Sequence, residues 1–284
     1  MSGGILVFGR AGQLARALAR QAPVTALGRA EVDLMRPGAA EAAIAARAPD
    51  LVINAAAFTG VDQAESEAGA AYRLNAEAPG EMARACAARG LPFLHVSTDY
   101  VFDGSGTAPW AEDAVPAPCN LYGASKLAGE KAVRDAGGAW AVLRTSWVFS
   151  AQGANFVRTM LHLAETRASL RVVADQIGGP TPAADIAKAL LHMGRQMAAG
   201  HPGGLYHFAG APAVSWAGFA REIFARAGRA VTVEEIPTEA YPTPAARPRN
   251  SRLDCRRITA DFGIAPPDWR VALDAVLSEL EESA

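Results

Sequence analysis

Residues 4–15 read GILVFGRAGQLA, an apolar run that is followed by a glycine-containing turn and the start of an Ala-rich stretch. The apolar run predicts a buried strand, and residues 13–21 have the spacing of an amphipathic helix. Gly9 and Gly12 permit a tight turn between the two, where free N–H groups at the helix start can face a pyrophosphate. A Gly-x-x-Gly pattern also fits an ordinary turn, but its place in the first strand–helix unit favours a dinucleotide site.

Short apolar runs alternate with helical stretches through the first half of the chain, as they do in βαβ units. The runs are continuously apolar, which fits strands covered on both faces of a parallel sheet. Beyond about residue 150, Pro and Gly become frequent, and further strand and helix signals follow. We therefore predict an α/β fold, with a Rossmann doubly wound parallel sheet in an NAD(P)-binding domain at 1–150. Residues 151–284 mainly form a smaller α/β substrate-binding lobe, with some segments interleaved with the first domain. The expected strands are 4–8, 24–27, 51–54, 93–97, 141–145, 205–208 and 231–236, and the expected later helices are 183–199 and 215–227.

The composition limits the classes of partner. The chain carries 27 Lys plus Arg against 29 Asp plus Glu, a formal net charge of -2, so nucleic-acid binding is not expected. It has no apolar run long enough to span a membrane and no signal-type N-terminus, so we expect a cytoplasmic location without membrane attachment. Its three cysteines include no Cys-x-x-Cys pair, which argues against a disulfide framework or a zinc site.

The end of the second expected strand bears on the choice of cofactor. A NAD-type site would place an acidic residue there to hold the ribose 2′-hydroxyl. Here Gly28 and Arg29 follow the strand, and the first acidic residue is Glu31. A guanidinium suits a 2′-phosphate, so Arg29 favours NADPH; a solvated surface arginine is the alternative.

Tyr122 and Lys126 are the strongest catalytic pair in the sequence. Their spacing of four places both side chains on one face of the helix that begins there. The chain has five tyrosines and three lysines, so this spacing is uncommon by chance. A nearby ammonium favours the ionised phenol, and it should bring the pKa of Tyr122 toward the working range of a proton donor. Lys126 would also bond the nicotinamide ribose; a plain surface pair is the alternative.

Thr98 follows the expected strand 93–97, at the carboxyl edge where open α/β sheets bind ligands. A hydroxyl in this place can hydrogen-bond the substrate oxygen that receives a proton. Ser and Thr also end strands for structural reasons, so Thr98 gains weight only from its order with the turn at Gly9 and the Tyr122 and Lys126 pair.

Through Gly9-x-x-Gly12, Ser97-Thr98 and Tyr122-x-x-x-Lys126 the chain resembles the extended short-chain dehydrogenase/reductase superfamily. Further motifs, spread from about residue 4 to 280, resemble the dTDP-4-dehydrorhamnose reductase family more narrowly. These motifs are NAAAFTGVD at 54–62, STDYVFD at 97–103, YGASKLAGE at 122–130, RTSWVF at 144–149, DQIGGPT at 175–181 and RPRNS at 247–251.

The resemblance implies reduction of the 4-keto group of dTDP-4-dehydro-6-deoxy-L-mannose to dTDP-L-rhamnose by NADPH, or by NADH in permissive members. It implies that Tyr122 donates the proton with Lys126 as its partner, that Asn75 helps, and that Thr98 also contacts the sugar. The remaining implied sugar contacts are Asp99 and Trp147. The implied cofactor contacts, beside Gly9 and Arg29, are Gly12, Gln13, Leu14, Asp33, Leu34, Ala57, Thr59, Tyr122 and Lys126.

Two departures from the family bear on metal and assembly. Some members form a magnesium-bridged dimer through glutamates, one of which lies on the first helix. Here residues 13–21 contain no carboxylate, and Ala183 and Ala184 stand where a further glutamate is expected. The departures argue against magnesium and against that dimer, and they favour a monomer or a weak homodimer.

Two other functions remain open at this point. A nucleotide-sugar dehydratase or epimerase of the same superfamily is the nearest, but dehydratases carry Thr-Asp-Glu after the fourth strand, whereas here Tyr100 takes the third position. The acid/base pair for water elimination is therefore incomplete. A non-catalytic regulatory subunit, similar to the methionine adenosyltransferase β subunit, is the second alternative. The presence of Thr98, Tyr122 and Lys126 argues against it.

Overall fold

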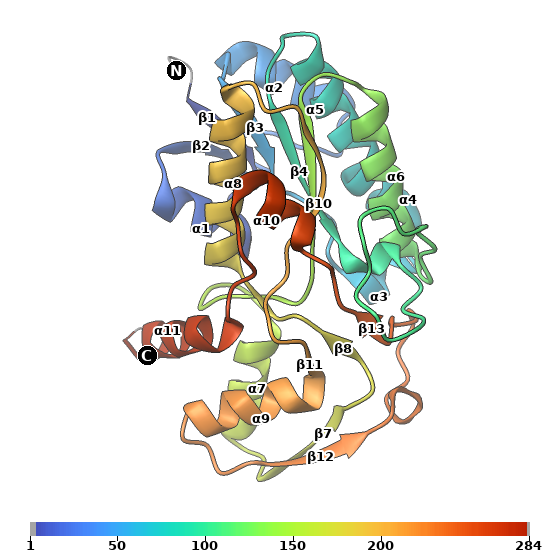
Figure 1. Ribbon diagram of the computed structural model, residues 1–284, viewed down its shortest axis with the longest axis vertical. Coiled ribbons are helices and arrows are strands. Elements are labelled where there is room, and N and C mark those ends of the chain that lie inside the picture. Colours follow the sequence, from blue (N-terminus) through green and yellow to red (C-terminus); the bar gives the residue numbers. More distant parts are fainter. Residues whose placement is uncertain (1–3, 283–284) are drawn as a thin grey trace.

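Six parallel strands form the largest sheet of the computed structural model, which describes residues 4–282 (Figure 1). The order across the sheet is β10-β5-β4-β3-β1-β2. The chain therefore adds β2 on one side of β1 and all later strands on the other side, which places the switch point between β1 and β3. The crevice beyond the carboxyl ends of such strands is where open α/β sheets bind their ligands. The predicted doubly wound parallel sheet is confirmed. Its strands are β1 (Ile5–Phe8), β2 (Val24–Leu27), β3 (Leu51–Asn54), β4 (Phe93–Thr98), β5 (Trp140–Thr145) and β10 (Gly203–His207).

Helices cover both faces of this sheet, which explains the apolar runs of its central strands β1 (ILVF) and β3 (LVIN). Successive side chains of β1 enter opposite cores: Val7 packs on one side, and Leu6 and Phe8 pack on the other. One face is covered by α1 (Gln13–Gln21), α8 (Ala183–Ala198) and α10 (Arg256–Phe262), and the other by α2 (Ala39–Arg47), α5 (Ala78–Ala87) and α6 (Leu121–Asp135).

A smaller lobe lies beyond the carboxyl end of the sheet (Figure 1). It has its own core, in which Phe149, Phe219 and Trp269 pack together. Helix α8 and strand β10 return from this part of the chain to the large sheet, so residues 183–207 belong to the sheet layer. The main elements of the smaller lobe are α7 (Phe156–Ala164), β7 (Ser169–Val173), α9 (Trp216–Arg226), β12 (Thr232–Ile236) and α11 (Trp269–Glu282).

Several short elements are not signalled by the sequence pattern. Two-residue strands join distant segments of the smaller lobe, because β8 pairs with β11 and with β13. Helix α9 begins one residue later than expected, since Ser215 caps it by accepting a hydrogen bond from Gly218 N at 3.0 Å. The other short elements are α3 (Val61–Ala64), α4 (Ala68–Tyr72), η1 (Arg73–Glu77), η2 (Asp99–Val101), β6 (Val148–Phe149), β8 (Ile177–Gly178), β9 (Thr181–Pro182), β11 (Val214–Ser215), η3 (Thr238–Ala240) and β13 (Asn250–Ser251).

Close packing fixes the helix that carries Tyr122 and Lys126. Helix α6 lies directly against the π-helical turn η1, and a Cβ at Gly129 would stand 1.9 Å from the carbonyl oxygen of Asn75. Only glycine permits this approach. At the start of α6, the Asn120 side chain accepts a hydrogen bond from Gly123 N at 2.7 Å, which caps the helix. Among residues 4–282, no helix has the length and apolar character needed to cross a membrane.

Candidate active site

A cavity of about 760 Å³ opens at the carboxyl ends of β1, β2 and β3, at the place where the strand order reverses. Its walls come from the segments that directly follow these three strands. The position agrees with the general rule for ligand crevices in doubly wound sheets. Five residues of the predicted cofactor set line it together, namely Gly9, Arg29, Asp33, Leu34 and Ala57.

The turn after β1 has the shape that a pyrophosphate requires. Gly9 has a φ of +110°, and a Cβ there would stand 3.1 Å from the backbone of Ala55, so the turn depends on glycine. Gly12 precedes α1 without a side-chain cap, which leaves the N–H groups of the first turn available to an anion. This cradle fits the phosphates of a dinucleotide.

Other predicted cofactor residues lie outside the walls of the cavity. Leu14 has its side chain in the core beneath α1, so only its backbone can face a phosphate, and Thr59 is exposed. Gln13 reaches the loop after β6, where its Oε1 accepts hydrogen bonds from Ser150 Oγ at 2.9 Å and Asn155 Nδ2 at 3.0 Å. The sequence pattern places these residues at the helix start but does not reveal where their side chains point.

The sequence reading missed the partner of the phosphate turn. Arg10 forms an ion pair with Glu31, and both line the cavity beside Arg29. Glu31 Oε2 also accepts a hydrogen bond from Gly28 N at 2.9 Å, so the first acidic residue after β2 closes the turn after that strand. Two arginines therefore border the cavity, and each has a carboxylate partner, Glu31 for Arg10 and Asp33 for Arg29.

Tyr122 and Thr98 meet at the carboxyl edge of β4. Tyr122 lies in the first turn of α6, and its phenol forms a hydrogen bond with Thr98. Burial raises the pKa of Tyr122 to about 12, the carboxylate of Asp99 adds to the rise, and the Thr98 hydrogen bond opposes it. The phenol is therefore fully protonated at neutral pH and faces the Thr98 hydroxyl.

Lys126 does not act on Tyr122 as predicted. Its Nζ donates a hydrogen bond to Val96 O at 2.6 Å, inside the sheet layer, and Tyr122 feels no lowering of its pKa from this ammonium. Burial lowers the pKa of Lys126 itself to about 8, and Glu130 partly opposes that change. The prediction that Lys126 depresses the pKa of Tyr122 is wrong for this geometry, because the lysine is bonded to the strand backbone.

Asp99 is buried next to this pair with an unused acceptor. Its Oδ1 accepts from Thr98 Oγ1 at 3.0 Å, whereas Oδ2 has no hydrogen-bond partner among the described residues. Burial raises the pKa of Asp99 to about 6, although hydrogen bonds from Ser251 and Thr98 oppose the rise. An unsatisfied buried oxygen at a sheet edge is suited to accept a hydrogen bond from a ligand hydroxyl.

We expect the change Asp99→Asn to remove a pH-dependent cost to stability. Because the carboxyl binds a proton more tightly in the folded chain, with a pKa of about 6 against an ordinary value of 3.8, its ionisation destabilises the fold as pH rises through this window. The free energy of unfolding of the wild type relative to Asp99→Asn should fall by roughly 3 kcal/mol at most between pH 4 and pH 7. Urea unfolding across that pH range measures it. A difference that stays flat would contradict the raised pKa.

Trp147 follows β5 and adopts a left-handed backbone conformation, with a φ of 48°. Its ring stacks on Trp216 of the smaller lobe at a centroid distance of 3.5 Å, and Gly178 lies against its other side. The residue thus stands at the seam between the two lobes. The strain of a non-glycine residue in this conformation is typical of functional sites.

Asn75 is buried in the π-helical turn and connects two segments of the site. It donates to Phe58 O at 3.0 Å and to Ser125 Oγ at 2.9 Å, and it accepts from Phe58 N at 2.9 Å. The loop after β3 is thereby fastened to the helix of Tyr122. Asn75 therefore has a structural role in holding these two segments together. It lies in a π-helical turn, and such turns are frequent at functional sites.

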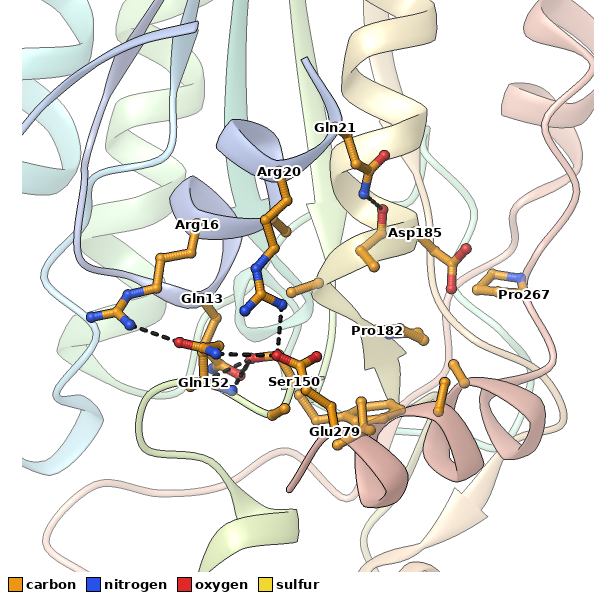
Figure 2. A pocket seen from close by; sticks show the side chains of 18 of the residues that line it. Gln13, Arg16, Arg20, Gln21, Ser150, Gln152, Pro182, Asp185, Pro267 and Glu279 are labelled. Carbon is orange, nitrogen blue, oxygen red and sulfur yellow. Dashed lines mark hydrogen bonds and ion pairs between the residues drawn. The ribbon is translucent and has the colours of Figure 1, made fainter. Parts of the chain in front are cut away.

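A second hollow, of about 580 Å³, lies between α1, α8 and α11 on the side of α1 (Figure 2). Figure 2 shows Arg16 and Arg20 reaching from α1 toward the opposite wall, where Arg20 pairs with Glu279 at 2.7 Å and Arg16 donates to Gln152 at 2.7 Å. A magnesium site requires clustered oxygen ligands. Within residues 4–282 no three His, Cys, Asp or Glu side chains form such a group, and α1 presents cations here, so this donor set does not fit magnesium.

Comparison with known proteins places this geometry among related enzymes. The family model described as RmlD substrate binding domain matches residues 3–282. The chain is 45% identical over 294 residues to a dTDP-4-dehydrorhamnose reductase of Burkholderia thailandensis, with 97% of this chain and 98% of the relative covered.

Solved structures show the same similarity. A dTDP-4-dehydrorhamnose reductase from Clostridium acetobutylicum superposes with a TM-score of 0.93 at 33% identity, covering 98% of this chain and 99% of the other. The enzyme of the same name from Bacillus anthracis, in complex with NADP, gives a TM-score of 0.91 at 33% identity, covering 98% and 100%.

Proposed function

The chain belongs to the RmlD family of dTDP-4-dehydrorhamnose reductases, and from this membership we propose which of its residues perform the reaction. It is an NADPH-dependent oxidoreductase that reduces the 4-keto group of dTDP-4-dehydro-6-deoxy-L-mannose to give dTDP-L-rhamnose. The observation that carries the assignment of roles is the contact between Tyr122 and Thr98 at the carboxyl end of β4. The dinucleotide cavity lies at the same edge of the sheet.

The proton transfer uses groups of this chain. NADPH bound in the cavity supplies the hydride that adds to the sugar carbonyl. Tyr122 gives its phenolic proton to the oxygen that becomes the new hydroxyl, and Thr98 hydrogen-bonds the same oxygen while negative charge develops on it. The raised pKa keeps the phenol protonated until the much more basic alkoxide forms. Lys126, bonded to Val96 O, is proposed to help hold the nicotinamide end of the cofactor and not to lower the pKa of Tyr122.

The sugar contacts come from both sides of the seam. Asp99 Oδ2, buried and unpaired, accepts from a sugar hydroxyl, and the Trp147 ring provides an apolar wall. Ser251 of β13 lies against Asp99 and so brings a segment of the smaller lobe to the substrate. These three residues are proposed to orient the dTDP-sugar so that its C4 carbonyl faces Tyr122.

The cofactor contacts follow the walls of the cavity. Gly9 and the start of α1, with Gly12, Gln13 and Leu14, hold the pyrophosphate. Arg29 meets the 2′-phosphate at the mouth, where its side chain is 83% exposed and only 3.8 Å from Asp33. The adenine wall is formed by Leu34, Ala57 and the neighbouring Thr59, and Tyr122 and Lys126 face the nicotinamide end.

The change Arg29→Ala should weaken NADPH use selectively. We expect the KM for NADPH to rise about tenfold, the loss of one charge-assisted phosphate contact, while the KM for NADH stays within about twofold. Initial rates with both cofactors measure the ratio. Arg195→Ala, at an exposed position of α8 away from this cavity, is the matched control and should change neither KM. Equal losses with both cofactors would remove Arg29 from the 2′-phosphate site.

We also propose the partners, the assembly, the location and the domain division of the protein. The formal net charge of -2 supports a protein that binds no nucleic acid, and the cationic face of α1 supports a monomer or weak homodimer without magnesium. The absence of a membrane-crossing helix among residues 4–282 is compatible with the proposed cytoplasmic location. We also propose the division into an NAD(P)-binding domain at 1–150 and a mainly substrate-binding lobe at 151–284.

The direct test is a reductase assay with the purified chain. NADPH oxidation, followed by absorbance, should begin when dTDP-4-dehydrorhamnose is added and should yield dTDP-L-rhamnose, identified by chromatography and mass. A dTDP-glucose sample without the 4-keto group is the matched control and should leave NADPH unchanged. No oxidation with the keto sugar, together with tight binding to another enzyme, would favour a regulatory subunit and overturn the reductase assignment.

A further inference from the structure

The buried side chain of Asn54, at the end of β3, has only one possible orientation. Its Oδ1 accepts a hydrogen bond from Ala56 N at 3.1 Å, and a backbone N–H can only donate. The amide oxygen is therefore on that side, and the NH₂ group points the other way, toward His95 Nδ1 at 3.0 Å.

This orientation fixes the tautomer of His95. An amide NH₂ donates, so Nδ1 must accept, and the single proton of the neutral ring is on Nε2. His95 is fully buried in β4, and both desolvation and the nearby Lys126 lower its pKa well below the usual value, so the ring is neutral throughout the working pH range. The Nε2–H is then a hydrogen-bond donor on the side of the ring opposite Asn54.

The group that this N–H faces is Lys126. Nε2 of His95 lies 3.4 Å from Nζ of Lys126, while Nζ is also 2.6 Å from Val96 O. An ammonium carries only donors, so the ammonium and the Nε2–H oppose each other. A neutral amine has a lone pair that accepts from Nε2–H and still donates to Val96 O. The pair of contacts thus stabilises the amine form relative to the ammonium.

We propose that Asn54 and His95 are positioning residues that set the proton affinity of Lys126, by holding an N–H donor against its Nζ. The inference rests on the proposed function, since Lys126 belongs to the catalytic set that it assigns. In the amine form of Lys126, the lone pair of Nζ accepts a hydrogen bond from His95 Nε2–H while Nζ still donates to Val96 O. The lowered pKa of Lys126, about 8, agrees with this geometry.

Other charged groups around Lys126 are already engaged elsewhere. Glu130 on the same helix favours the ammonium but forms a bidentate pair with Arg144 of β5. On the elements packed against α6, Asp99 of η2 faces Tyr122, Arg73 of η1 bonds Glu81 of α5, and Asp62 of α3 bonds Arg247. His95 is the titratable side chain in direct contact with Nζ among the described residues.

The tautomer can be measured without any activity. In the full-length protein labelled with ¹⁵N-histidine, long-range ¹H–¹⁵N spectra distinguish a protonated Nε2 from a protonated Nδ1, and His95→Phe identifies the His95 signals by their loss. We expect the wild type to show His95 protonated at Nε2 from pH 6 to 9. Protonation at Nδ1, or a His95 that titrates in this range, would overturn the proposal even if the reductase is active.

The second arm inverts the contact. In Asn54→Asp, one carboxylate oxygen keeps the Ala56 N–H and the other requires an N–H from Nδ1, so the His95 proton should move to Nδ1 and Nε2 should accept from the Lys126 ammonium. The alkaline limb of kcat, near pH 8 in the wild type, should then move up by about one pH unit, which is about tenfold more turnover on that limb.

The two readouts must change together. Gln196→Glu, on the exposed end of α8, adds the same charge away from α6 and should leave the limb and the tautomer as they are. If the alkaline limb of kcat moved to higher pH in Asn54→Asp while the His95 proton stayed on Nε2, the effect would come from charge alone and the proposal would be wrong. An alkaline limb that did not move in an active variant would also contradict the proposal. A wild type that turns over no sugar at any pH contradicts the proposed function instead, and the tautomer measurement still decides the contact.

Discussion

The change Tyr122→Phe should lower kcat by about 10²- to 10⁴-fold, the range that a positioned general acid contributes. Among residues 4–282, the phenol and the Asp99 carboxylate are the acidic groups bonded to Thr98 at the sheet edge, and the carboxylate is ionised above pH 6. Phenylalanine preserves the ring and its edge contact with Tyr100, with centroids 5.6 Å apart, so the helix start should stay folded. Steady-state rates at saturating sugar and cofactor measure the effect.

Tyr100→Phe is the matched control, because it removes a phenol from the neighbouring ring of the same pair. Burial and the charge of Asp99 raise the pKa of Tyr100 beyond that of Tyr122, so its hydroxyl is the weaker acid, and we expect less than a tenfold change in kcat. NADPH affinity, followed by fluorescence titration, should be similar in both variants. If Tyr122→Phe kept near-wild-type turnover, the proton would have to come from another group.

The change Glu130→Ala should cost about 3–5 kcal/mol of unfolding free energy, the penalty of leaving one charge of a buried pair uncompensated. Glu130 and Arg144 are joined by two hydrogen bonds, of 2.8 and 2.6 Å, and their side chains are only 7% and 2% exposed. Ser97 also donates to Glu130 at 2.5 Å, and neutral His207 stands 3.3 Å from the guanidinium. Without the carboxylate, the Arg144 guanidinium would be a buried charge without a charged partner between α6 and β5.

Chemical denaturation measures this loss, and two comparisons test its cause. Asp274→Ala breaks an exposed pair with Arg226, whose side chains are 57% and 29% exposed, and should cost no more than about 1 kcal/mol. The double change Glu130→Leu with Arg144→Leu removes both charges and should recover much of the loss. A cost for Glu130→Ala as small as that for Asp274→Ala would show that the buried pair is not a structural support.

Local pattern was sufficient for the sheet layer. The strands at 24–27 and 51–54 and the helix at 13–21 lie where the apolar runs predicted them, because continuous apolar residues are stable only between two covered faces. The short strands β8, β11 and β13 carry no such pattern, since two residues provide no periodicity and their pairing depends on chain segments up to 73 positions apart. The smaller lobe is therefore held together in part by contacts that local sequence does not encode.

The candidate site divides in the same way. Spacing alone brought together Thr98, Tyr122 and the turn at Gly9, since strand ends and helix starts at one sheet edge must be neighbours. Spacing could not reveal that Lys126 turns to Val96 O or that Asn54 holds His95, because these depend on which backbone donors and acceptors remain free after the sheet forms.

By itself, the sequence determined the fold class and the position of the glycine turn after β1, and it indicated the candidate catalytic hydroxyls, because each follows from periodicity or from residue types at strand ends. Only the tertiary structure decided the protonation of the site. The pKa of Tyr122, Asp99 and Lys126 is set by burial and by partners that come from other strands and helices, and these distances exist only once the chain has packed.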